Sequence, residues 1–177
     1  MIGVFLKIIE QNFIFPKNEL NHIGKTLSKC ELIIADNCYL ALQDFGGGIL
    51  YFYLVVTAKK KRGKGVFEKL LCLIMAERKP AVFATITCHP AIVKVVIRVM
   101  EKCNYQLVTR NGKVTKTIVQ KIKEDEGDAG NIEIVDERII WRGFYGNDIP
   151  QRDKKFVLPA PLLPGDAFLL IFTKKEE

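Results

Sequence analysis

The feature that most constrains this chain is a basic, glycine-containing loop between an apolar extended segment and a helical one. The run Ile49–Thr57 is rich in β-branched and aromatic residues, which predicts a strand. The residues AKKKRGKG follow it, and the apolar spacing of Val66–Arg78 predicts a helix packed on a sheet. A strand that enters a helix through such a loop presents free backbone N–H groups and the positive end of the helix dipole. The sequence therefore predicts an anion site suited to a pyrophosphate.

The alternation of strand and helix continues beyond this helix. Residues 81–87 are nearly all apolar, which is typical of a strand buried on both faces. Pro90 suits the first turn of a second helix, because the N–H that proline lacks is unused there. Residues 104–109 then return as a strand. Residues 49–108 thus predict an ordered unit of strand, loop, helix, strand, helix and strand.

The segments before this unit predict a sheet that begins at the start of the chain. Residues 2–9 and 12–15 are apolar and β-prone, so we expect one or two strands there. A single helix is expected from Asn18 to about residue 29. Two further strands are expected at residues 31–36 and 38–44, joined by turn-forming residues.

The segments after this unit give weaker signals. Residues 114–123 fit either a helix or a strand, and the acidic residues 124–130 indicate a solvated loop. Residues 132–145 contain another strand candidate. Residues 156–157 and 167–173 predict a closing strand pair.

Composition limits the classes of protein that the chain can represent. Its 177 residues suit a single domain over residues 1–177, with residues 124–177 as a C-terminal extension. No apolar run is long enough to span a bilayer, and the start lacks the pattern of a signal peptide. The five cysteines form no CxxC pair and the histidines number two, so we expect reduced thiols, no metal site and a cytoplasmic location. The net charge of +7 favours anionic partners.

The basic loop fits one kind of phosphate ligand better than two others. The Walker pattern needs G-x-x-x-x-G-K-[ST], and the dinucleotide fingerprint needs three glycines and a downstream acidic residue. The loop here reads Lys60-Lys61-Arg62-Gly63-Lys64-Gly65, and the later turns read His89-Pro90 and Asn104-Tyr105. On these residues the chain resembles the GCN5-related N-acetyltransferase (GNAT) superfamily, whose central motif is [QR]-x-x-G-x-[GA]. A lysine stands here in the place of the usual Gln or Arg.

The resemblance implies a fold, a cofactor and a reaction. The fold is α/β (α+β): a GNAT-like mixed, mostly antiparallel central sheet with a splayed pair of central strands, flanked by helices. The cofactor is acetyl-CoA or another acyl-CoA, and residues 49–108 are its binding core. The reaction is N-acyl transfer, in which an amine attacks the thioester directly in a ternary complex.

The resemblance also implies which residues hold the cofactor. The end of the long strand would offer backbone groups to the pantetheine arm, and the amides of the basic loop would hold the pyrophosphate. The expected cofactor-binding residues are Val55, Val56, Thr57, Lys60, Arg62, Gly63, Lys64, Gly65 and Val66.

Several side chains are candidates for proton transfer. Family members often carry a tyrosine as general acid near the end of the fourth helix, where this chain has Met100. His89 at a strand end and Tyr145 in the segment WRGFYGND could move a proton instead. Tyr51 and Tyr53, on one face of the long strand, could do the same. Each of the four also has a structural interpretation. Tyr51 and Tyr53 could be ordinary packing residues, His89 could make a structural hydrogen bond at a helix N-terminus, and Tyr145 could belong to a structural loop.

Other functions stay open at this point. Nucleic acid could be the acceptor, because the chain is basic and its N-terminal region has room for about one lid helix. The chain could also be a non-catalytic GNAT-like binding module, or a basic nucleic-acid-binding domain outside the family. By analogy with the family, a homodimer would pair through residues 167–173.

Overall fold

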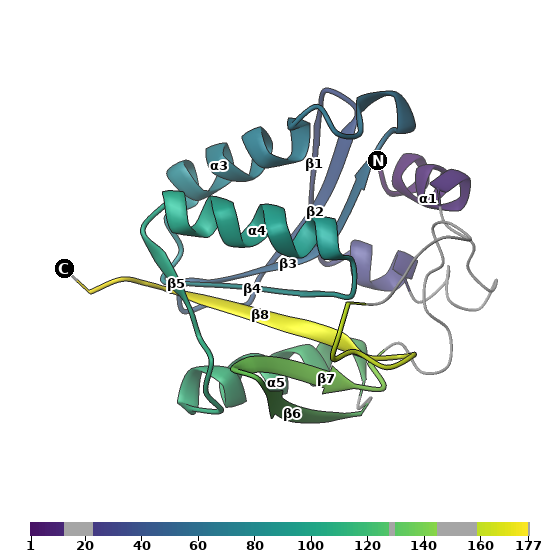
Figure 1. Cartoon of the computed structure of the whole chain (residues 1–177). Coiled ribbons are helices and arrows are strands. Elements are labelled where there is room, and N and C mark those ends of the chain that lie inside the picture. Colours follow the sequence, from purple (N-terminus) through teal and green to yellow (C-terminus); the bar gives the residue numbers. More distant parts are fainter. Residues whose placement is uncertain (13–22, 128–129, 145–158, 177) are drawn as a thin grey trace.

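A mixed sheet forms the centre of the molecule (Figure 1). The computed structural model describes residues 1–12, 23–127, 130–144 and 159–176. The strand order is β1-β2-β3-β4-β8-β7-β6, and β5 pairs with β8 beside this path, which makes eight strands. The strands are β1 (Glu31–Ala35), β2 (Cys38–Asp44), β3 (Ile49–Thr57), β4 (Val82–Thr87), β5 (Tyr105–Leu107), β6 (Asn131–Val135), β7 (Arg138–Arg142) and β8 (Ala167–Lys174).

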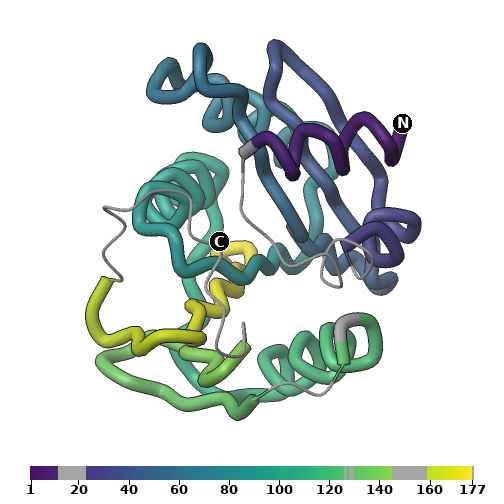
Figure 2. The backbone as a smooth tube through the Cα atoms, turned by 90° about the vertical axis from the view of Figure 1, so that its right-hand side faces the viewer, coloured from purple at the N-terminus to yellow at the C-terminus, as the bar shows by residue number. Residues whose placement is uncertain are grey.

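Helices cover both faces of the sheet (Figure 2). The helices are α1 (Ile2–Asn12), α3 (Val66–Arg78), α4 (Pro90–Lys102) and α5 (Lys113–Glu126), with a short 3₁₀ turn η1 (Lys59–Lys61) before α3. Helices α3 and α4 share one apolar core with β2, β3, β4 and β8. Helix α5 packs on the other face against Tyr51, and α1 packs there against Ala41 and Val56.

The central part of the chain folds as the sequence predicts. Among the strand pairs, β3 and β4 run parallel, whereas the pairs on either side of them are antiparallel. The predicted strand Ile49–Thr57 and the predicted helix Val66–Arg78 are confirmed, as is a helix that begins at Pro90. The expected mixed, mostly antiparallel sheet with flanking helices is therefore confirmed.

The predicted N-terminal strand at residues 2–9 does not form, because Ile2–Asn12 is helix α1, and residues 13–15 of the second predicted strand lie outside the described residues. Phe5 and Ile9, four residues apart, are fully buried against the sheet. This helical spacing prevails over the β propensity of the individual residues. A further helical segment at residues 23–27 precedes β1, so two helical segments, rather than one, come before the sheet. The rest of the expected helix from Asn18 lies outside the described residues.

The segment between β5 and β8 forms a helix and a hairpin. Residues 114–123, which fit either a helix or a strand, belong to α5, because Ile118 and Ile122 are both fully buried on one helical face. Strands β6 and β7 then form an antiparallel hairpin whose second strand pairs with β8. The expected partner strand at residues 156–157 lies outside the described residues.

Strand β8 lies inside the sheet. It pairs with β4 along Phe168 to Thr173 on one side, and with β5 and β7 on the other. One edge of residues 168–173 is paired with β4 and parts of the other edge are paired with β5 and β7, so little of this strand is left for a second copy, and a homodimer through residues 167–173 stays a prediction.

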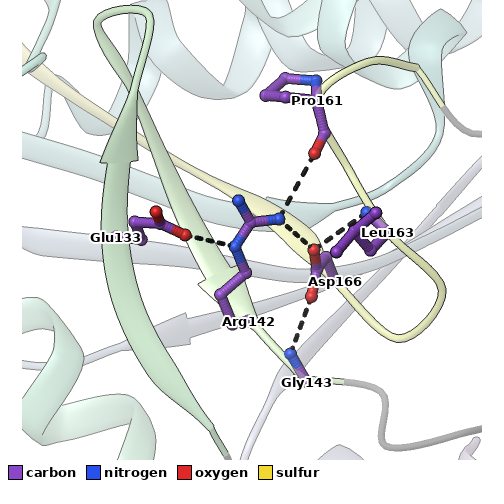
Figure 3. Close-up of polar contacts among 6 residues, drawn as sticks. All are labelled: Glu133, Arg142, Gly143, Pro161, Leu163 and Asp166. Carbon is purple, nitrogen blue, oxygen red and sulfur yellow. Dashed lines mark hydrogen bonds and ion pairs between the residues drawn. The ribbon is translucent and has the colours of Figure 1, made fainter.

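A buried ion pair attaches the hairpin to the loop before β8 (Figure 3). The Arg142 guanidinium pairs with Asp166, donates to the carbonyl of Pro161 at 3.3 Å and pairs with Glu133 at 2.5 Å. The Asp166 carboxylate also accepts from the N–H groups of Leu163 and Gly143 at 2.9 and 3.0 Å. The end of β7 and the start of β8 are thus held together at their polar groups as well as by strand pairing.

Candidate functional site

The parallel strands β3 and β4 separate halfway along their length. Their pairing runs from Ile49 opposite Val82 to Phe52 opposite Thr85 and then ends. At that last pair the Thr85 hydroxyl donates to the Phe52 carbonyl at 2.9 Å. Beyond it, β3 continues for five residues to Thr57 while β4 continues to pair with β8. The two strands therefore splay, as the resemblance implies.

A β-bulge in β3 stands at the point of separation. Ala41 of β2 faces Leu54, but Leu42 faces Phe52, so Tyr53 is an extra residue in the ladder. A bulge bends its strand and increases the local twist. After the bulge, Leu54 to Thr57 pair with β2 only, and the structure shows no strand partner on their other edge among the described residues. A strand edge without a partner strand can pair with the polar groups of a ligand, although Val56 is fully buried here and the Thr57 carbonyl accepts a hydrogen bond from Arg62.

The basic loop follows directly from this open edge. Gly63 and Gly65 both lie in the left-handed region, with φ of 73° and 72°. Side chains with a Cβ adopt this region at a cost, so both turns require glycine. A Cβ at either position would meet no atom within 4 Å, so the backbone here borders open space. Gly65 is the N-cap of α3 and offers no side-chain cap, which leaves the N–H groups of the first turn without one.

The base of the loop is held by the turn between β1 and β2. Ala58 donates its N–H to the carbonyl of Asn37 at 2.9 Å, and Lys61 forms a 2.5 Å ion pair with Asp36. Arg62 donates through Nε to the carbonyl of Thr57 at 3.0 Å. Lys61 thus fixes the loop to the turn between β1 and β2, and Arg62 fixes it to the end of β3.

The remaining basic side chains of the loop face solvent. Lys59, Lys60 and Lys64 are exposed, and no ion pair is recorded for them within the described part of the chain. The acidic residue of the first turn of α3, Glu68, pairs with Lys102 at 2.8 Å and Arg98 at 3.2 Å. The hydrogen bond from Lys102 lowers the pKa of Glu68, with a smaller contribution from the charge of Arg98, so α4 compensates this charge near the helix N-terminus. The loop thus combines exposed positive charge with the N-terminus of a helix, which are features that favour an anion.

The two tyrosines of β3 lie on the face opposite α3 and α4. Their ring centroids are 6.5 Å apart, as expected for residues on one face. Tyr51 is 2% exposed and stacks on Phe45 with ring centroids 5.1 Å apart, so it is a core residue. Tyr53, at the bulge, is half-buried and packs between the apolar groups of α1 and α5. Tyr53 is therefore the better placed of the two to meet a ligand at the splay.

His89 caps helix α4. Its Nδ1 accepts from the N–H of Ala91 at 3.2 Å, and its own N–H donates to Thr87 at 3.1 Å. This arrangement satisfies orphan donors at the start of the helix, as a side-chain cap does. His89 thus has a structural role at the end of β4, and its catalytic role stays a prediction.

The other residues singled out by sequence are structural or lie outside the described chain. Met100, which the resemblance aligns with the usual tyrosine, is fully buried. Trp141 is fully buried and meets Phe144 at a centroid distance of 5.3 Å, so it packs in the core. Tyr145 lies outside the described residues. Burial raises the pKa of the Cys88 thiol to about 11, which makes a nucleophilic role for it unfavourable at neutral pH.

One polar group on the face of Tyr51 was not found by sequence reasoning. Gln43 of β2 is 8% exposed and donates through Nε2 to Asp125. The acidic residues 124–130 indicated a solvated loop, but Asp125 belongs to the last turn of α5. The signal that could have found it is the position of Asp125 seven residues after the buried Ile118, on the same side of a helix.

Neither a metal site nor a membrane span is found in the described part of the chain. The described residues hold no group of three or more potential metal ligands. No described helix has the length and apolar character needed to cross a bilayer.

Comparisons with known proteins give structural likenesses only. No protein-family model matches the chain, and no curated protein matches it. A Bacillus subtilis acetyltransferase in complex with CoA is 10% identical, with 89% of this chain and 85% of that chain covered and a TM-score of 0.49. A GNAT-family acetyltransferase from Elizabethkingia anophelis with acetyl-CoA bound is 14% identical, with 89% and 83% covered and a TM-score of 0.44.

A third solved structure is of the same kind. It is described as an acetyltransferase of the GNAT family from Desulfovibrio desulfuricans, and it is 10% identical, with 97% of this chain and 89% of that chain covered and a TM-score of 0.48. All three TM-scores lie below 0.5, so the assignment of the fold class rests on the strand order and register of this chain.

Proposed function

We propose that this chain is an acyl-CoA-dependent N-acyltransferase of the GNAT type, with acetyl-CoA as the first cofactor to test. One observation carries the proposal: the unpaired edge of β3 leads directly into an uncapped helix N-terminus through two left-handed glycines. A long ligand with an amide-bearing arm and a pyrophosphate has groups for both parts of this surface. The solved structures with CoA or acetyl-CoA bound are consistent with this choice.

The residues present suit such a cofactor. Backbone groups of Val55, Val56 and Thr57 would hydrogen-bond the pantetheine arm, because this edge of β3 has no strand partner among the described residues. The loop and the first turn of α3 would hold the pyrophosphate. Their contributing residues are Lys60, Arg62, Gly63, Lys64, Gly65 and Val66. When bound, the cofactor supplies a thioester whose acyl carbon an amine can attack.

Catalysis would come mainly from positioning. The acceptor ammonium first gives one proton to solvent; the neutral amine then forms a bond to the thioester carbon, the C–S bond breaks, and the nitrogen loses a second proton while the leaving thiolate takes one up. An amine held beside the splay attacks in an effectively unimolecular step, and N–H groups at the bulge would stabilise the developing oxyanion. Tyr53 is the nearest candidate to move a proton. Tyr51, His89 and Tyr145 remain secondary candidates.

The cofactor site is tested by thermal unfolding with and without acetyl-CoA. The variant Gly63→Glu places a carboxylate in the anion site, and Gly112→Glu makes the same change at the N-cap of α5, where φ is negative and a Cβ also has open space. Acetyl-CoA at about 100 times its dissociation constant should stabilise wild type and Gly112→Glu by about 2.7 kcal/mol. It should not stabilise Gly63→Glu.

An unchanged melting temperature of wild type with acetyl-CoA would contradict the proposal. An equal rise of the melting temperature in Gly63→Glu would show that the cofactor does not bind at this loop. Turnover, measured as free thiol released from acetyl-CoA over a panel of amines, separates an enzyme from a binding module. The binding module is the second candidate, because the buried Met100 takes the place of the usual proton donor.

One of the two arguments for nucleic acid as the acceptor still applies. The net charge of +7 stands, but the argument from a single lid helix does not, because α1 and residues 23–27 are both helical. Short oligonucleotides therefore belong in the acceptor panel at low salt, where electrostatic binding is strongest.

A further inference from the structure

A polar cluster lies between α5 and the sheet, on the face opposite α3 and α4. The Nε2 of Gln43 donates to the Asp125 carboxylate, while Gln43 as a whole is 8% exposed. The amide oxygen Oε1 of Gln43 is buried and has no hydrogen-bond partner. It is the one such buried side-chain atom found among the described residues. Buried polar atoms are almost always hydrogen-bonded, so this oxygen indicates a donor that the described residues do not supply.

Lys29, the ion-pair partner of Asp125, shows that the cluster binds a primary ammonium group. The Nζ of Lys29 lies 2.7 Å from Oδ1 of Asp125, and the side chains are 48% and 20% exposed. A primary ammonium thus already contacts this carboxylate, and it comes from a side chain that is about half exposed. Exposed ion pairs contribute little to stability, so a second ammonium can compete for the carboxylate.

The cluster lies beside the splay of the central strands. Gln43 pairs with Tyr51 in the β2–β3 ladder, and the next residue of β3, Phe52, makes the last pair with β4. The bulge at Tyr53 follows at once. An ammonium held at Gln43 would therefore lie on the face of β3 at the point where its edge becomes open.

We propose that Gln43 and Asp125 form the binding site for the primary alkylammonium group of the acceptor. An ammonium carries three N–H donors, so it can bind the carboxylate of Asp125 and the unpartnered Oε1 of Gln43 together. In this structure the Nζ of Lys29 contacts Asp125 and so occupies part of the proposed ammonium site. The inference deepens the proposed function, on which it rests, by assigning acceptor recognition to α5, which is inserted between β5 and β8.

The site is tested by calorimetric titration of the full chain without cofactor. The probes are cadaverine and N-acetyl-lysine methylamide, which carry the same head group as a free diamine and as a lysine side chain. The uncharged 1,5-pentanediol is the control ligand. Removal of the competing ammonium in Lys29→Met should tighten binding about fivefold, and Asp125→Asn should abolish it. Glu124→Gln, one residue away and exposed, should bind as wild type does.

Each outcome decides the inference. Tighter binding of either amine by Lys29→Met together with its loss in Asp125→Asn supports the site, and the better of the two amines identifies the source of the acceptor. Equal binding by wild type and Asp125→Asn, binding of the diol, or no amine binding in wild type and Lys29→Met overturns it. The acetyl-CoA thermal shift is measured on the same preparations. Its absence in wild type counts against the proposed function and leaves the amine result to stand on its own.

Discussion

Single residues determine the backbone conformation of the basic loop after β3 and the position of the bulge within β3. Gly63 and Gly65 adopt a backbone region that other residues avoid, and Tyr53 is the extra residue of a bulge. Each of these local features has an energetic cost that surrounding contacts must offset. Asp36 and Arg62 supply such contacts, because they fix the basic loop to the turn before β2 and to the end of β3.

Asp166 is the carboxylate whose environment makes the clearest prediction about acid stability. Burial raises its pKa, but the N–H groups of Leu163 and Gly143 and the Arg142 guanidinium outweigh burial, and the net pKa is lowered. A lowered folded-state pKa contributes stability above the ordinary aspartate value of about 3.9, and this stability is lost as pH falls through the folded-state pKa.

We therefore expect Asp166→Asn to lower the free energy of unfolding by about 1–3 kcal/mol at pH 7 and to flatten its decline below about pH 4. Urea unfolding over this pH range is the measurement. Asp136→Asn, in the exposed β6–β7 turn, is the control and should change stability by less than about 0.5 kcal/mol. Parallel profiles for wild type and Asp166→Asn would show that the ion pair does not act as described.

At the level of elements, α5 and the β6–β7 hairpin lie between β5 and β8 in the chain. Helix α5 closes the face of β3 that carries Tyr51, through the fully buried Ile118 and Ile122. Lys121 adds a 2.6 Å hydrogen bond to the carbonyl of Phe45. The insertion is thus packed on the sheet as part of the same core.

Ile122→Ala tests this packing. We expect it to lower the free energy of unfolding by about 2–5 kcal/mol, because it removes a fully buried side chain and leaves a cavity. Ile134→Ala makes the same change on β6 at a side chain that is 42% exposed, and it should cost less than half as much. Chemical denaturation of both variants gives the comparison. A similar small loss in both would mean that α5 does not pack on the sheet in solution.

For the whole molecule, the net charge of +7 should attract an anionic cofactor over a distance. Raising the salt from about 0.01 M to about 1 M shortens the Debye length from about 30 Å to about 3 Å. The affinity for acetyl-CoA should therefore fall with salt, as measured by calorimetry.

The distribution of this charge gives a matched pair of variants. Lys59→Gln with Lys60→Gln removes two charges at the loop, and Lys174→Gln with Lys175→Gln removes two beyond the opposite end of the sheet, where β8 meets the start of β4. The first pair should reduce the salt dependence of binding more than the second. Equal slopes for both would indicate a response to net charge alone, with no specific part for the loop.

The sequence alone was enough to predict the segment from β3 to α4. Its strand, loop, helix, strand and helix each carry a strong local signal: an apolar β-branched run, two glycines in a basic loop, helical apolar spacing and Pro90 at a helix start. Local propensity, periodicity and turn chemistry agree there, so little was left for long-range contacts to change.

Tertiary structure decided the rest, because the deciding contacts join residues far apart in the chain. Phe5 and Ile9 turn a β-prone start into α1 by packing on the sheet. Strand β8, near the end of the chain, becomes interior because β4 and β7 both pair with it. Gln43 and Asp125 are 82 residues apart, and neither carries a motif. Their meeting depends on the packing of α5, which no local pattern specifies.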